Sequence, residues 1–204
     1  KLRNYQDLMD AGGLNNPSIL NMLNVKYVLT RKKIKNSSFQ KVMNINGLYQ
    51  NKNVLPKSWI VENITSVENQ KESLLKTLSN GFKPESEAIV LGYNGKYLKN
   101  KSSGVVSMIK RKENRLELST KTGTGGLLVL SEIFYGPGWK AYVNGKPVPI
   151  FQANHILRSI EVPAGDSNIL FEYDISNWSF ARLISRAFFI VIVIILLFVL
   201  YKKR

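Results

Sequence analysis

The hydrophobic positions of the chain culminate in an uninterrupted block near its C-terminus. Ala187–Tyr201 spans fifteen residues, AFFIVIVIILLFVLY, without a charge, proline or glycine. As a helix this block rises about 22 Å, which is shorter than the ~30 Å hydrocarbon core of a bilayer. An upstream extension reaches a full span if Arg182 and Arg186 extend toward the headgroups. A buried core helix would show polar positions at helical spacing, and none interrupts the block. We therefore predict one transmembrane helix over about Ser179–Tyr201.

The residues that flank this block indicate its orientation. Trp178 and Tyr201 fall where the aromatic belts of membrane proteins lie, and the basic triplet 202–204 closes the chain. Because basic residues beside a span resist translocation, we expect the C-terminus in the cytoplasm and residues 1–177 outside it. The chain begins at Lys1 without a segment that could export those residues, so either an upstream portion exists or the orientation is reversed. We expect a C-terminal fragment of a longer membrane protein.

Upstream of the span, the pattern predicts two parts and a boundary near residue 52. Residues 1–52 combine a helical signal over 4–23 with a strand at Val25–Thr30 and a strand pair around the turn Asn44–Gly47. We expect a small α/β segment there. Residues 53–177 are expected to form an extracytoplasmic β-domain, and residues 178–204 the membrane helix with its basic cytoplasmic end.

The second part is dominated by strands. Leu116 and Leu118 alternate with polar residues, which is typical of a half-buried strand. The strongest local signal is the pair Trp139–Val143 and Lys146–Ile150 around Asn144-Gly145, because Asn-Gly supplies the two positive φ angles of a type I′ turn. Prolines in the second arm confine it to a sheet edge. Seven or so such strands predict a mainly β fold, an antiparallel sandwich or jelly roll.

Composition narrows the chemistry. Lys and Arg number 29 against 14 Asp and Glu, a formal net charge of +15. The short basic runs at 31–33 and 110–112 are typical of solvated turns, and no zinc-finger, P-loop or single-strand-binding pattern supports nucleic acid. Membrane lipid or an acidic envelope glycan is the expected partner. With no cysteine and the single histidine His155, thiolate and His-pair metal sites are excluded, and we expect neither a metal nor a cofactor.

Aromatic residues and one arginine are the main candidates for ligand binding. Tyr135, Trp139 and Tyr142 could stack on sugar rings, and Trp59 could join them, although aromatic residues in a sandwich also form core. Arg158 shares the alternation phase of the apolar residues around it, so its guanidinium is buried if that phase faces the core. There it must bond a carboxylate or backbone carbonyls, or line a groove.

Three weaker candidates concern catalysis and lipid binding. His155 could act as a general base with Ser159 or Asp174, or be an ordinary loop residue. The second candidate is a pair of strand carboxylates for glycoside hydrolysis, which can equally be solvated or ion-paired. These carboxylates are Glu132 and Glu172. The third candidate is Arg182 with Arg186, one helical turn apart, which could attract a lipid phosphate or simply extend to the headgroups.

Several blocks of the sequence together resemble one bacterial family. They are Leu23–Val28, Asn53–Trp59, Tyr135–Ile150, Ala153-Asn154, Arg158 and Val162–Gly165. The chain is similar to the C-terminal region of YfhO-type bacterial membrane proteins, and its most specific block is 135–165.

This family resembles the GT-C glycosyltransferases, which implies many upstream membrane helices in the bacterial cytoplasmic membrane, then an extracytoplasmic domain and a last helix. It also implies transfer of a sugar from a polyprenyl-phosphate carrier onto an envelope glycan. The catalytic acid of such enzymes lies in an early loop that this chain lacks, so no catalytic residue is expected here. His155 stands where members often carry an aromatic residue.

Three functions remain open on the sequence. The chain could be the accessory part of a membrane glycosyltransferase that binds or positions a glycan. It could be a non-enzymatic envelope-binding or structural domain tethered by one helix. An anchored hydrolase is the third and rests only on the carboxylates.

Overall fold

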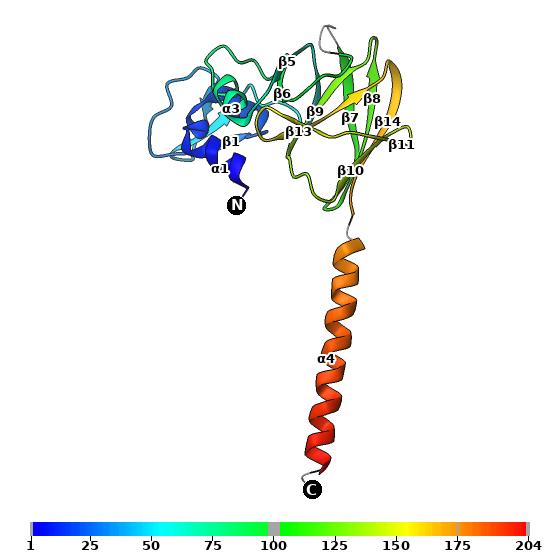
Figure 1. The fold of residues 1–204 in the computed structure, drawn as a ribbon. Coiled ribbons are helices and arrows are strands. Elements are labelled where there is room, and N and C mark those ends of the chain that lie inside the picture. Colours follow the sequence, from blue (N-terminus) through cyan, green and yellow to red (C-terminus); the bar gives the residue numbers. More distant parts are fainter. Residues whose placement is uncertain (1, 98–102, 175, 203–204) are drawn as a thin grey trace.

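The computed structural model describes residues 2–97, 103–174 and 176–202 as a β-rich head followed by one long helix (Figure 1). Three sheets make up most of the head, and its helices are short. The prediction of a mainly β fold with one C-terminal apolar helix is therefore confirmed.

A five-stranded antiparallel sheet forms one layer of the sandwich. In spatial order it contains β11 (Lys146–Val148), β10 (Trp139–Val143), β14 (Gly165–Tyr173), β8 (Arg115–Thr122) and β7 (Gly104–Lys112). The predicted hairpin joins β10 to β11, with φ of 51° at Asn144 and 78° at Gly145. The proline-bearing strand β11 lies at the edge, as predicted.

A six-stranded sheet forms the second layer. In spatial order it contains β4 (Ser58–Val61), β9 (Gly126–Ile133), β13 (Leu157–Val162), β12 (Phe151–Ala153), β6 (Glu87–Leu91) and β5 (Asn63–Val67). Every pair is antiparallel except β5 with β6, which run parallel. The helix α3 (Gln70–Thr77) connects these two parallel strands, as a parallel crossover requires.

Apolar residues fill the space between the two sheets. They alternate along β8, β10 and β14 on one side and along β4, β9 and β13 on the other. Members of this core include Leu116, Leu118, Leu128, Leu130, Ile160, Ile169 and Phe171. The short turn after β13 carries the chain from the six-stranded to the five-stranded sheet, so β13 and β14 lie in opposite layers.

A second core covers the other face of the six-stranded sheet. Helices α1 (Arg3–Asp10), α2 (Pro17–Met22) and α3 pack there against β4, β5, β6 and β9. Leu8, Ile19 and Met22 are fully buried in it. β9 and β13 are therefore buried on both faces, which explains their nearly continuous apolar sequences.

The N-terminal part also carries a three-stranded sheet. Its spatial order is β1 (Tyr27–Leu29), β3 (Leu48–Asn51) and β2 (Phe39–Lys41), all antiparallel. The expected helical signal over 4–23 is divided into α1, the 3-10 helix η1 (Gly13–Asn15) and α2, because Gly12 has a φ of 87° and breaks the first helix. The side chain of Asn16 caps α2 by accepting the N–H of Ser18 at 2.9 Å.

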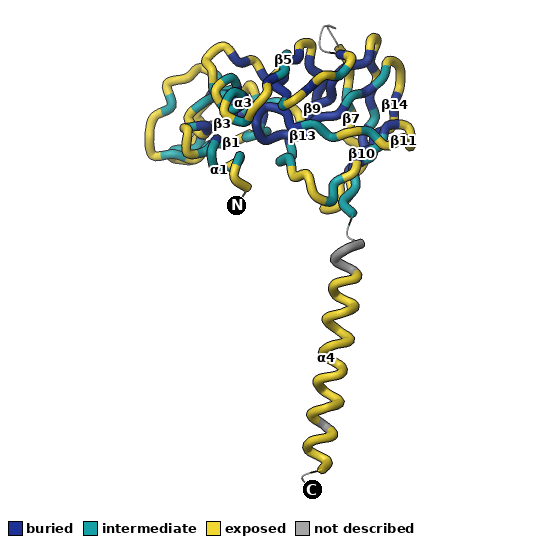
Figure 2. The backbone as a smooth tube through the Cα atoms, viewed as in Figure 1, coloured by how far each residue is buried: buried dark blue, intermediate teal, exposed yellow. Residues whose placement is uncertain are grey.

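The C-terminal helix α4 (Ser176–Lys202) extends away from the head. Within the described chain, Phe180–Lys202 is the one helical stretch whose length and composition suit a membrane span, at 23 residues. Its described side chains are exposed along the whole stretch (Figure 2). The predicted aromatic-belt role of Trp178 falls on a side chain outside the described residues.

Some local predictions were incomplete. The strands β5 and β12 were not predicted, because both are short and follow directly on other strands.

Candidate functional site

A cavity of about 320 Å³ lies beside the hairpin β10–β11 and the loop that precedes it. Tyr135 and Trp139 line it, together with Phe134 and the proline segment of the hairpin's second arm. Tyr135 comes from the loop between β9 and β10 and is 41% exposed, whereas Trp139 begins β10 and is half-buried. The cavity therefore offers one aromatic ring exposed at the surface and one half-buried ring held by the sandwich.

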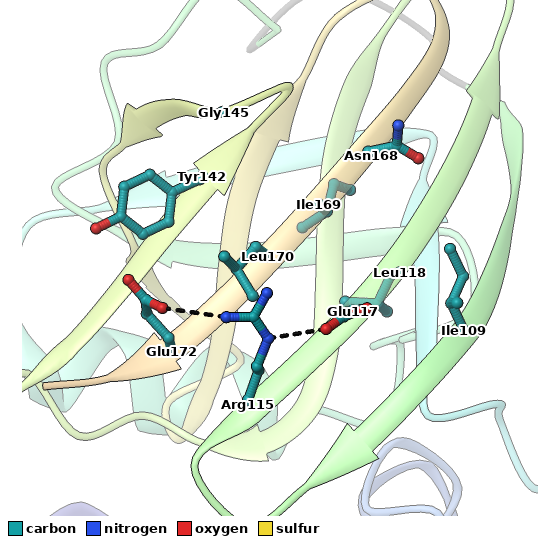
Figure 3. Close-up of a pocket in the computed structure, with 10 residues that line it drawn as sticks. All are labelled: Ile109, Arg115, Glu117, Leu118, Tyr142, Gly145, Asn168, Ile169, Leu170 and Glu172. Atoms are coloured by element: carbon teal, nitrogen blue, oxygen red, sulfur yellow. Dashed lines mark hydrogen bonds and ion pairs between the residues drawn. The ribbon is translucent and has the colours of Figure 1, made fainter.

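Tyr142 also borders this cavity, but it occupies the opposite face of β10 from Trp139. Residues three positions apart in a strand point to opposite faces. Tyr142 accordingly lines a larger hollow of about 490 Å³ on the outer face of the five-stranded sheet (Figure 3). The two rings cannot stack on the same face of one sugar.

Arg158 supports Trp139 from inside the fold. Its guanidinium carbon lies 3.9 Å from the centroid of the Trp139 ring, and its Nε donates to the carbonyl of Ile133 at 3.0 Å. The side chain is on β13 and only 6% exposed. Of the alternatives predicted for a buried Arg158, the structure shows the bond to a backbone carbonyl. The structure thus brings Tyr135, Trp139 and Arg158 to one place.

One guanidinium nitrogen of Arg158, Nη1, is buried without a hydrogen-bond partner among the described residues. Burial lowers the pKa of Arg158 to about 10, and the carboxylate of Glu132 partly offsets this effect. The group is still protonated at neutral pH, so a positive charge with one unsatisfied buried donor lies against the ring of Trp139.

The start of β10 is tied to the point where the chain leaves the sandwich toward α4. Trp139 packs edge-to-face on Tyr173 with ring centroids 5.5 Å apart. Asp174 donates its N–H to the carbonyl of Gly138 at 2.7 Å and accepts from Lys140 at 2.7 Å. Gly138 has a φ of 84°, and a Cβ there would lie 2.7 Å from the Tyr173 ring, so only glycine fits.

The outer hollow holds a charge cluster that the sequence analysis did not predict. Arg115 donates to Glu117 at 2.8 Å, and its second branch lies 3.5 Å from Glu172 (Figure 3). The hydrogen bond from Arg115 lowers the pKa of Glu117. The signal was present in the sequence, because Arg115 and Glu117 are two apart in a strand and share a face.

The two carboxylates considered for hydrolysis are both ion-paired. Glu172, on the five-stranded sheet, pairs with Arg115, and Glu132, on the six-stranded sheet, lies 2.9 Å from Nη2 of Arg111. This matches the interpretation of these residues as paired carboxylates rather than a catalytic pair.

His155 lies in the turn between β12 and β13, with a φ of 64° and 1% exposure. Neither proposed catalytic partner, Ser159 or Asp174, is hydrogen-bonded to its imidazole ring. Ser159 donates to the carbonyl of Phe151, Asp174 pairs with Lys140, and neither ring nitrogen of His155 hydrogen-bonds a described residue. Burial lowers the pKa of His155, and the nearby Asp7 carboxylate and Asn4 backbone act in the opposite direction. The arrangement lacks the parts of a catalytic triad.

The remaining candidates lie apart from the cavity. Trp59 is buried in the second core, where its indole N–H donates to the carbonyl of Pro84 at 2.7 Å, so it does not join the other aromatic residues. Arg182 and Arg186 are exposed, one turn apart, near the beginning of α4.

Comparison with known proteins identifies part of the chain. Residues 93–185 match the family model of the bacterial membrane protein YfhO. The match includes the whole five-stranded sheet, the hairpin, Arg158 and the first part of α4, whereas the resembling blocks at 23–28 and 53–59 lie outside it. The chain matches no curated protein and no solved structure. Residues 93–185, which contain the aromatic cavity and lead into the apolar helix, are therefore similar to the bacterial membrane protein YfhO over somewhat less than half of the chain.

Proposed function

We propose that this chain is the C-terminal extracytoplasmic domain and last membrane helix of a polytopic protein that resembles lipid-linked-sugar glycosyltransferases. In this role the head binds or positions a cell-envelope glycan while the chemistry takes place in upstream segments. The YfhO match and the apolar helix support a membrane protein of this kind.

The observation that carries the glycan role is the cavity beside β10. The exposed ring of Tyr135 and the half-buried ring of Trp139, which the Arg158 guanidinium supports from inside, are stacking surfaces of the kind that sugar recognition uses.

Titration of the detergent-solubilised protein with water-soluble teichoic-acid fragments tests this role. Trp139→Ala and Tyr135→Ala should each weaken binding at least tenfold. Tyr135 is a surface residue of the loop, so its variant keeps the test valid if the Trp139 variant is unstable. Tyr27→Ala removes a ring on β1 that is 53% exposed, against 41% for Tyr135, and serves as the control. Unchanged binding in both cavity variants would refute the role.

We further propose that Arg182 and Arg186 attract the phosphate of a polyprenyl carrier at the extracytoplasmic surface of the cytoplasmic membrane. Their support is their exposure on one face of α4 where the helix leaves the head. Replacing both by Gln in the full-length protein should reduce binding of the carrier lipid. Unchanged binding would leave them as residues that merely reach the headgroups.

The second candidate is a non-enzymatic envelope-binding or structural domain held by the same helix. The absence of a catalytic arrangement around His155 and the pairing of Glu132 and Glu172 favour either of these two candidates over a hydrolase. The upstream reading frame separates them, because ten or so preceding hydrophobic spans support the transferase and a signal peptide alone supports the tether.

A further inference from the structure

The N-terminal part of the head carries a strongly one-sided charge. Residues 11–61 contain eight Lys and Arg and not one Asp or Glu. A segment of this length normally contains charges of both signs. Because this one contains no acidic residue, no neighbour within the segment can neutralise its cations. Arg31, Lys32 and Lys33 are all exposed and form no ion pair with any carboxylate of the described chain.

Exposed aliphatic side chains lie in the same place as these cations. Leu29 at the end of β1 is 75% exposed, and Met43 in the turn between β2 and β3 is 84% exposed. Ile45 in that turn is half exposed as well. We name Leu29–Lys33 with Met43 and Ile45 the basic tip.

Backbone contacts hold the two segments of the basic tip together. Thr30 donates its N–H to the carbonyl of Gly47 at 2.9 Å, and its hydroxyl accepts the N–H of Lys32 at 3.1 Å. Leu29, Arg31 and Gly47 line one shared hollow. Gly47 has a φ of 75°, and a Cβ there would lie 2.5 Å from the carbonyl oxygen of Thr30. The tip is therefore a fixed surface rather than two independent loops.

The inner side of the same sheet shows why these aliphatic residues face outward. Phe39, Tyr49 and Leu20 form the small buried cluster of this part, and Val28 packs against it from β1. Because neighbours in a strand point to opposite faces, the side chains of Tyr27 and Leu29 must lie on the outer face. Nothing within the described chain covers them.

The position of the tip relative to α4 suggests what it contacts. Figure 1 shows α1 and β1 on the side of the head from which α4 leaves, whereas β5 and β6 lie on the opposite side. Figure 2 shows that the loops at this end of the head are mostly exposed. If α4 crosses the bilayer, the N-terminal part faces the same bilayer surface.

We propose that the basic tip docks on the anionic headgroup surface of the bilayer that α4 crosses. Lys and Arg would contact lipid phosphates, and Leu29, Met43 and Ile45 would enter the boundary between headgroups and acyl chains. A soluble polyanion would account for the cations but would gain nothing from the aliphatic side chains. The proposal involves different residues from the glycan site and holds for either orientation of the chain.

A single-cysteine experiment tests this docking, because the chain has no native cysteine. The Met43→Cys protein carries an environment-sensitive fluorophore and is reconstituted in bilayers of phosphatidylcholine alone or with added phosphatidylglycerol. We expect a blue shift, and quenching by lipids brominated near the headgroup, only in the anionic bilayers. A label at Leu75→Cys is the matched control, because Leu75 is an exposed aliphatic residue on α3. Its emission should not change with lipid composition.

Charge variants complete the test. Arg31→Gln, Lys32→Gln and Lys33→Gln together should lower the ratio of docked to undocked protein by about a hundredfold at low salt. The control neutralises three exposed lysines elsewhere, Lys71, Lys83 and Lys121, and should leave docking unchanged. Equal emission in neutral and anionic bilayers would overturn the proposal. A label that responds to soluble polyphosphate but not to phosphatidylglycerol would also overturn it.

Discussion

The guanidinium of Arg158 lies against the ring of Trp139, with its carbon 3.9 Å from the ring centroid, although the two residues belong to different sheets of the sandwich. This contact joins the layers at the end of the sandwich from which the chain continues into α4. It also holds the tryptophan that lines the candidate glycan cavity. The stability of the head and the proposed glycan binding would therefore depend on the same pair.

Removing Trp139 should destabilise the head measurably. Trp139→Ala removes the contacts with Arg158 and Tyr173, and we expect a loss of about 2 to 4 kcal/mol in the free energy of unfolding. Trp139→Phe keeps an aromatic ring in place and should cost less than about 1.5 kcal/mol. Denaturant unfolding followed by near-ultraviolet circular dichroism measures both.

The contribution of the cation–π contact itself follows from a double-mutant cycle with Arg158→Met. We expect a coupling of about 1 kcal/mol between the two side chains. Additive effects of the single variants would show that the contact contributes nothing.

The turn of the β10–β11 hairpin provides a test of the backbone. Gly145 has a φ of 78°, so Gly145→Ala should cost about 1 to 2 kcal/mol through strain alone. Gly123→Ala is the control, because Gly123 lacks a positive φ and its added Cβ would meet no atom within 4 Å. Thermal unfolding midpoints compare the two variants, and equal midpoints would contradict the turn assignment.

His155 should make the stability of the head depend on pH. Its folded pKa lies below the usual value of about 6.5, so the unfolded chain binds the proton more tightly. The stabilisation is complete above pH 6.5 and is lost as the pH falls from there through the lower folded pKa. His155→Asn tolerates the positive φ and removes the titration.

We therefore expect the unfolding free energy of the parent protein to fall between pH 7 and pH 5, and that of the Asn variant to stay nearly flat. His155 is the chain's only histidine, which isolates the effect. Parallel pH profiles of the two proteins would show that His155 is not the group responsible.

The ion-paired carboxylates should have small effects. Glu132→Gln and Glu172→Gln each break a partly exposed pair, so each should cost at most about 1 kcal/mol. Neither should change glycan binding at the cavity beside β10. Assays of glycan cleavage should show no activity to lose, and activity that disappears in these variants would revive the hydrolase.

The sequence predicted those elements whose structure is determined by a short stretch of their own residues. The helix α4 follows from its uninterrupted apolar block, and the β10–β11 hairpin from Asn144-Gly145. The parallel pairing of β5 with β6 could not be predicted, because it depends on the packing of α3 rather than on an alternation within either strand. For the same reason the sequence did not reveal the second core under α1, α2 and α3.

The candidate site was predictable in part. The buried position of Arg158 followed from strand alternation, but its contact with Trp139 crosses two sheets and has no local signal. The same alternation rule places Tyr142 on the other face of β10 from Trp139. The sequence analysis overlooked this because it grouped the aromatic residues by their proximity in sequence. Trp59 lies in a different core because the two faces of β4 contribute to two cores: Trp59 packs in the second core and Ile60 between the two sheets.

The central claim is that α4 crosses the membrane with the head on its extracytoplasmic side. It is tested most directly by labelling intact bacteria that carry the full-length protein with Leu75→Cys as its only cysteine. A membrane-impermeant maleimide should modify this exposed head position before lysis. Labelling that appears only after the cells are broken would contradict the proposed orientation.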